Sequence, residues 1–158
     1  MVEPDLGQRV SLREITADSV RSIVALAVAD DQTHFVASNA VSLAQALFEP
    51  IAWYRGIYLD DEPVGFVMLE DESLRVPPPD RPSIGVWRFM IDARFQHRGI
   101  GRVAIGQVID HARARGFGTL ALSYVPGPGC PEPFYRGLGF RPTGRVDGIE
   151  VVLERDLA

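Results

Sequence analysis

The sequence predicts a mixed α/β fold in which one sheet carries helices on both faces. Short segments that alternate apolar and polar residues indicate half-buried strands, and a continuous apolar run over 84–91 indicates a central strand covered on both sides. Between them lie stretches whose apolar residues recur at helical spacing. The 158 residues contain no internal repeat and no linker, so we expect one domain over 1–158.

The first part of the chain predicts one strand and two helices. Residues 10–15 alternate apolar and polar side chains, as a strand with one buried face does. Thr16 and Asp18 are candidate N-caps for a helix over 20–29. A second helix is expected over about 33–48, just ahead of a proline.

The middle part of the chain predicts three strands. Segments 54–59 and 64–69 flank a charged turn at 60–63 that ends in proline, which favours antiparallel pairing. The segment 74–82 holds four prolines and is expected to be an exposed loop. The apolar run at 84–91 follows this loop as the central strand.

The last part of the chain predicts two helices and three strands. A helix over 99–115 places its apolar residues on one face and ends at Gly116. The elements expected after it are a strand over 119–124, a short helix over 131–138 and a closing hairpin of 140–146 and 150–157 around Asp147-Gly148. The predicted order is therefore β-α-α-β-β-β-α-β-α-β-β.

Charge and composition exclude several classes of function. The net charge is −5, and all 16 basic residues are arginine, so chemistry that needs a lysine is excluded. A chain that is acidic overall lacks the charge footprint of a nucleic-acid binder. The longest apolar stretch, 23–29, is too short to span a bilayer, and the first residues show no signal peptide, so we expect a cytoplasmic protein. Cys130 and three scattered histidines do not have the spacing of a zinc site, so we expect no metal.

A glycine-containing loop at 96–101 carries the most informative pattern. It reads Gln-His-Arg-Gly-Ile-Gly and lies between the central strand and the predicted helix over 99–115. Free backbone N–H groups and the helix dipole make such a junction a site for a phosphate-like anion. The alternative is that the glycine pair only turns the chain. Arginines favour a bound polyanion, such as the phosphates of coenzyme A, and they are Arg94, Arg98 and Arg102 near the loop and Arg113 and Arg115 at the far end of the helix.

The pattern Q-x-x-G-x-G at 96–101, followed by Phe-Tyr-Arg-Gly-Leu-Gly-Phe at 134–140, resembles the GNAT superfamily of N-acetyltransferases. The resemblance implies a central, mostly antiparallel mixed sheet of six to seven strands, flanked by about four helices. It also implies acetyl-CoA as the acyl donor and direct transfer to a primary amine in a ternary complex. The residues that it implies for cofactor binding are Phe89, Met90 and Ile91 on the central strand, and Gln96, His97, Arg98, Gly99, Ile100, Gly101 and Arg102 in the loop.

Segments 10–16, 35–44 and 87–92 also resemble bacterial spermine/spermidine acetyltransferases, which implies a polyamine acceptor. An aminoglycoside or a peptide amine is the alternative acceptor, and a non-catalytic acyl-CoA sensor is the alternative class. The chain departs from these relatives before the short helix, where Pro128 stands in place of an asparagine that touches CoA and Pro131 in place of a frequent alanine. The resemblance also allows a homodimer.

Catalytic roles follow from what acetyl transfer requires, namely a neutral amine, a polarised thioester carbonyl and a proton for the thiolate. Tyr135 occupies the position of the family's general acid, and a backbone N–H near Met90 or Ile91 is the candidate for polarising the carbonyl. Glu150 is the first candidate for the base, ahead of Asp147 and Glu70. For substrate binding we expect Asp30, Asp31 and Trp87. The alternatives are packing for Tyr135 and ordinary exposed carboxylates for the acids.

Overall fold

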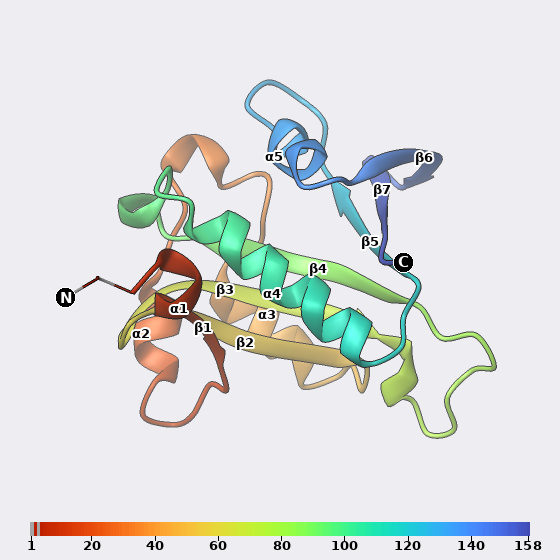
Figure 1. The fold of residues 1–158 in the computed structure, drawn as a ribbon, viewed down its shortest axis with the longest axis horizontal. Helices are drawn as coiled ribbons and strands as arrows, with labels where there is room; N and C mark the ends of the chain where they lie inside the picture. Colours follow the sequence, from red (N-terminus) through yellow and green to blue (C-terminus); the bar gives the residue numbers. More distant parts are fainter. Residues whose placement is uncertain (1, 3) are drawn as a thin grey trace.

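The computed structural model describes residue 2 and residues 4–158, and Figure 1 shows its single sheet with the helices around it. The strands are β1 (Val10–Arg13), β2 (Ala52–Leu59), β3 (Glu62–Asp71), β4 (Ile84–Ile91), β5 (Thr119–Tyr124), β6 (Arg141–Asp147) and β7 (Glu150–Asp156). The α-helices are α1 (Leu6–Arg9), α2 (Val20–Ala25), α3 (Asn39–Ala46), α4 (Ile100–Ala114) and α5 (Glu132–Gly137). Short 3₁₀ turns occupy Asp30–Gln32, Glu72–Leu74 and Ala93–Phe95.

The sheet is mixed and mostly antiparallel, as the sequence predicts. Its strand order is β1-β2-β3-β4-β5-β7-β6. Every pairing between neighbouring strands is antiparallel except that of β4 with β5, which is parallel. Because parallel neighbours need a crossover, the chain passes through α4 between these two strands.

The two faces of the sheet carry different helices. On one face, α4 buries an apolar stripe against β1 to β4, and this stripe includes the predicted Ile105, Val108, Ile109 and Ala112. On the other face, Ile23 of α2 packs with Phe66, Met68 and Met90. Figure 1 shows α4 lying along the sheet in front of β2 to β4. The predicted two-sided covering of the sheet is therefore confirmed.

The first two predicted helices are shorter than expected. The predicted helix over 33–48 begins only at Asn39, where Ser38 acts as N-cap and its hydroxyl accepts from the Val41 amide at 3.2 Å. The predicted helix over 20–29 ends at Ala25, because Leu26 is extended. Residues 27–38 instead form a loop with one 3₁₀ turn. The sequence analysis also missed α1, whose N-cap Asp5 accepts from the amide of Gln8.

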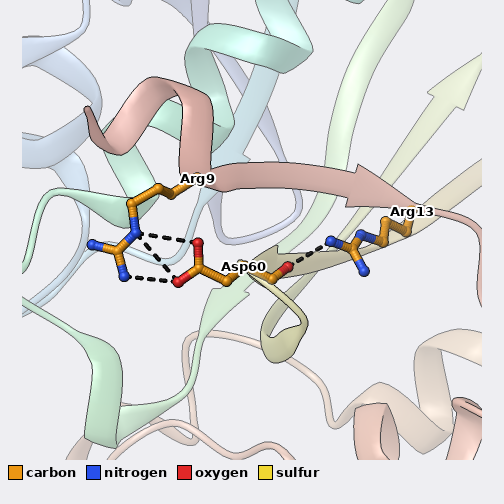
Figure 2. Close-up of polar contacts among 3 residues, drawn as sticks. All are labelled: Arg9, Arg13 and Asp60. Carbon is orange, nitrogen blue, oxygen red and sulfur yellow. Dashed lines mark hydrogen bonds and ion pairs between the residues drawn. The ribbon is translucent and has the colours of Figure 1, made fainter. Parts of the chain in front are cut away.

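An ion-pair cluster fastens β1 to the turn between β2 and β3 (Figure 2). Arg9 donates two hydrogen bonds to one carboxylate oxygen of Asp60 and one to the other, with the shortest at 2.8 Å. Arg13 donates to the Asp60 carbonyl and pairs with Asp61 at 3.2 Å. The hydrogen bond from Arg9 lowers the pKa of Asp60. Asp60 adopts a φ of 54°, which aspartate tolerates better than most residues.

No helix in the described part of the chain combines the length and the apolar character that crossing a bilayer requires.

Candidate functional site

The candidate site is an opening between β4 and β5. These two strands pair at two positions, Gly85 with Ala121 and Val86 with Leu122, near the start of β4 and in the middle of β5. Beyond Val86 they diverge, and Figure 1 shows β5 rising away from β4 toward α5. The rest of β4, residues 87–91, therefore has no strand partner on this side. A cavity of about 1020 Å³ fills the opening, bounded by β4, the loop before α4, the end of β5 and α5.

A bulge in β4 decides which side chains reach each face of the sheet. The pairing of β3 with β4 shifts between Met68 and Leu69, which leaves Trp87 as an extra residue. Before the bulge, Val86 packs with the α4 side of the core, and after it Phe89 and Ile91 do so. Trp87 and Met90 pack on the face of α2 and α3. The extra residue at the bulge thus reverses which side chains of β4 point to each face of the sheet along the cavity.

The glycine loop enters α4 through two residues with positive φ. Gly99 is the N-cap of α4 with a φ of 83°, and His97 also has a positive φ, 63°. A Cβ on Gly101 would lie 3.3 Å from Phe134 of α5. Hence Gly99 permits the left-handed turn into the helix, and Gly101 permits the close approach of α5. All seven predicted loop residues except Arg98 line the cavity.

The five arginines of the polyanion prediction do not lie together. Arg102 is exposed on the first turn of α4 and lines the cavity. Arg98 lies over the Phe95 ring at 5.4 Å, and Arg94 pairs with Asp92 at 2.9 Å, which offsets its charge. Two arginines near the far end of α4 have structural partners: Arg113 donates to the Leu157 carbonyl, and Arg115 pairs with the buried Asp71. The positive charge beside the loop therefore comes from residues 94–102 alone.

Gln96 has an internal role besides its place in the loop. Its side-chain amide donates to the Ile91 carbonyl and to Gln32, both at 2.9 Å. Gln32 in turn accepts from the Ala29 amide. The Gln96 side chain therefore ties the end of β4 to the loop before α3. Since these bonds occupy the side-chain amide, the backbone is the part of Gln96 that remains for the predicted role in cofactor binding.

Tyr135 is buried among aromatic rings at the cavity wall. It makes edge-to-face contacts with Phe134 and Phe140, at 5.2 and 5.9 Å between ring centres. No hydrogen-bond partner for its hydroxyl occurs among the described residues. Burial raises the pKa of Tyr135, so the phenol holds its proton at neutral pH. Tyr135 therefore both packs against neighbouring rings and lines the cavity.

One part of the cavity wall carries both signs of charge. Trp87 and the half-buried Glu150 line it, as does Arg88, which the sequence analysis did not assign to the site. Asp30 and Asp31 are exposed in the 3₁₀ turn just before the lining residues and do not belong to the wall. Glu70 and Asp147 lie outside the wall as well. Burial, and the neighbouring charge of Glu49, raise the pKa of Glu70.

Several other wall residues were missed by sequence reasoning. The stretch 33–37, predicted as helix, contributes His34 and Phe35 from a loop. Tyr124 at the end of β5 and Cys130 complete the wall near α5. Residue type does not distinguish these positions in the sequence, because their place depends on the divergence of β5 from β4.

The comparison with protein families identifies one match. The model of the acetyltransferase (GNAT) family matches residues 18–140. Among curated proteins, the chain is 28% identical over 150 residues to a spermine/spermidine N(1)-acetyltransferase of Bacillus subtilis (strain 168). That alignment covers 87% of this chain and 91% of the relative.

Solved structures share the fold at lower identity. One is PaiA N-acetyltransferase of Thermoplasma acidophilum in complex with coenzyme A, with a TM-score of 0.67, 12% identity, and coverage of 93% of this chain and 98% of that one. Another is a GNAT family acetyltransferase of Elizabethkingia anophelis with acetyl-CoA bound, with a TM-score of 0.64, 17% identity, and coverage of 94% and 98%. At this identity the likeness concerns the fold.

Proposed function

Because the chain belongs to the acetyltransferase (GNAT) family, we propose that it transfers an acetyl group from acetyl-CoA to a primary amine within a ternary complex. The observation that carries this proposal is the opening between β4 and β5, which lies directly at the glycine loop before α4. Acetyl-CoA supplies the acetyl group as a thioester. The two structural neighbours named above contain coenzyme A or acetyl-CoA, which supports this choice of donor.

The residues present fit such a donor. The free backbone amides at the start of α4 and the exposed guanidinium of Arg102 suit phosphate groups. The stretch 87–91 of β4 has no strand partner on the side of the cavity, so an extended arm can pair with the backbone between the Trp87 and Ile91 carbonyls, which side chains already bond. The cavity of about 1020 Å³ is large enough for a ligand of that size.

Tyr135 is the proposed general acid. Its raised pKa keeps the phenol protonated at neutral pH, and we propose that it gives this proton to the thiolate as the C–S bond breaks. A backbone N–H of the unpaired part of β4, near Met90 or Ile91, is proposed to stabilise the developing negative charge on the carbonyl oxygen. Both groups lie on the cavity wall.

Glu150 is the proposed base, acting directly or through a water molecule. Of the three carboxylates considered, only Glu150 lines the cavity. Glu150 is the first residue of β7 and lines the same cavity as Trp87, whose ring can supply an apolar wall for an aliphatic chain. An acceptor amine that enters as an ammonium ion must lose one proton before attack, and a carboxylate at the wall can take it.

A polyamine such as spermidine is the acceptor that the Bacillus relative supports. The net charge of −5 favours the approach of a polycation. Asp30 and Asp31 are exposed and directly precede the lining residues 32–37. They are proposed to assist this approach rather than to contact the reacting amine.

The test is a thiol-release assay with acetyl-CoA and a panel of spermidine, spermine, an aminoglycoside and a short peptide. We expect amine-dependent release of coenzyme A, and calorimetry should detect binding of acetyl-CoA without any amine. Binding without release for every amine would support the sensor alternative and contradict the enzymatic proposal. Absence of binding at millimolar acetyl-CoA would contradict both.

A further inference from the structure

Arg88 is an arginine on the acceptor side of the cavity that has no carboxylate partner. It is half-buried on β4, directly after the bulge residue Trp87. In the part of the chain that the structure describes, nine other arginines form ion pairs with carboxylates, and Arg88 is not one of them. Its Nε is buried and has no hydrogen-bond acceptor. An unpaired buried donor is costly, and Glu150 and Glu70 act on the Arg88 guanidinium only from beyond ion-pair distance.

The partners that Arg88 does have are neutral and hold it in place. One terminal nitrogen donates to Gln45 of α3 and the other to the Trp87 carbonyl, both at 3.1 Å. The guanidinium also lies 5.2 Å from the centre of the Trp87 ring. These contacts fix the orientation of the guanidinium without neutralising its charge. Burial lowers the pKa of Arg88, although the charges of Glu150 and Glu70 act in the opposite direction.

The wall therefore carries a carboxylate, Glu150, and a guanidinium, Arg88, in one cavity. A polyamine complements only the carboxylate, and the guanidinium repels it. A zwitterion, which carries an amine and a carboxylate, complements both. We propose that Arg88 binds a carboxylate of the acceptor, so that the enzyme prefers amino acids with a free amine over diamines of equal length. This inference rests on the proposed acetyl transfer and replaces the polyamine with an amino acid as the preferred acceptor.

The test compares L-lysine with cadaverine, because these two amines differ only by the carboxylate. L-lysine methyl ester is the third arm, since it keeps the bulk of lysine and loses the negative charge. We expect the wild type to show a lower KM for L-lysine than for either of the other two. In Arg88→Met, KM for L-lysine should rise about 10- to 100-fold, the range for a lost charge-assisted hydrogen bond, whereas KM for cadaverine should not rise, because the charge that repels the diamine is removed.

Two further variants separate this role from a structural one. Arg81→Met removes the same charge from the exposed loop outside the cavity, and it should leave both KM values unchanged. Arg88→Lys keeps the charge and should restore part of the preference for L-lysine. Circular dichroism checks whether Arg88→Met still adopts the wild-type fold. The kcat for cadaverine shows whether the catalytic groups are still in place.

A binding readout does not depend on turnover. The chain has two tryptophans, so a Trp53→Phe background leaves Trp87 as the single indole, beside Arg88. Titration with L-lysine should change its fluorescence at lower concentration than cadaverine does, and Arg88→Met should abolish this difference.

The proposal is overturned if the wild type prefers cadaverine or treats the two amines alike, or if Arg88→Met changes both KM values equally. In those cases the proposed acetyl transfer still stands. If acetyl-CoA binds and none of the amines releases coenzyme A, the proposed function fails together with this inference.

Discussion

At the scale of single residues, burial decides the chemistry of Tyr135. Its ring packs between Phe134 and Phe140, and only 7% of the residue is exposed. The same burial raises the pKa of its phenol, so the hydroxyl stays protonated at neutral pH. Tyr135 is therefore a packed residue of the cavity wall, and its role as proton donor is the part of the proposal that a substitution can test.

Replacing Tyr135 with phenylalanine removes the hydroxyl and keeps the aromatic packing. Because general acid catalysis contributes about 10²–10⁴-fold to the rate, we expect kcat to fall by about 100-fold or more in Tyr135→Phe. Calorimetric affinity for acetyl-CoA should stay within about twofold, since the ring is retained. A variant that keeps full turnover would show that Tyr135 only packs.

His111 links the stability of the protein to pH. Its ring stacks on Trp53 at 4.2 Å, and its Nε2 is buried without a hydrogen-bond partner. Burial lowers the pKa of His111 below 6.5, and the charges of Arg115 and Arg55 add to this effect. The unfolded chain therefore takes up the proton at a higher pH than the folded one, and stability is lost as the pH falls below about 6.5.

The variant His111→Phe retains a stacking ring and cannot titrate. We expect the free energy of unfolding of the wild type to fall relative to that of the variant between about pH 7.5 and pH 5, as chemical denaturation at each pH would measure. At pH 8 the histidine is neutral in both states, so the difference measured there gives the effect of packing alone. A constant difference across this range would refute the assignment.

At the scale of elements, replacing the N-cap glycine of α4 and replacing a glycine in its interior should change stability in opposite directions. Gly99 holds a φ of 83° at the start of the helix, whereas Gly106 lies in its interior with no atom near the place of a Cβ. Alanine at Gly99 must adopt a left-handed conformation at a cost of about 1–2 kcal/mol. Alanine at Gly106 gains about 0.5–1 kcal/mol through helix propensity.

We therefore expect Gly99→Ala to lower the free energy of unfolding and to raise KM for acetyl-CoA, because the loop amides shift. Gly106→Ala is the matched control and should raise stability with KM unchanged. Urea denaturation and steady-state kinetics measure the two effects separately. Equal KM values for the two variants would argue against a role of the loop in binding the donor.

The predicted elements agree with the structure where local signals are strong. The apolar stripe of α4, the buried run of β4 and the glycine that ends α4 were all predicted correctly. The ranges predicted for the helices, 20–29 and 33–48, were too long. Apolar residues between 26 and 38 lie in a loop, from which they face the cavity and the core. Their burial in the tertiary structure, rather than helical periodicity, explains their hydrophobicity.

At the scale of the whole molecule, the sheet consists of two halves joined by only two residue pairs between β4 and β5. A ligand seated in the opening contacts both halves, and hydrogen–deuterium exchange should report it. We expect acetyl-CoA to slow exchange in residues 87–91, in the loop at 96–102 and in α5. Exchange in β1 and β2, which lie across the sheet from the opening, should not change.

Adenosine 3′,5′-bisphosphate provides a control for this experiment because it lacks the pantetheine arm. It should protect the loop at 96–102 and leave β4 unchanged. Equal protection of β4 by both ligands would contradict the proposed placement of the arm along this strand.

The sequence by itself determined the order of the strands and of the helices after α1, the glycine loop before α4 and the likeness to acetyltransferases, because these depend on residues close together in the chain. Only the tertiary structure decided that β4 and β5 diverge after Val86 and that Arg88 and Glu150 share one cavity while Asp30 and Asp31 lie outside it. The physical reason is that strand register, the bulge at Trp87 and the burial of a charge arise from contacts between distant segments. Local periodicity does not contain that information.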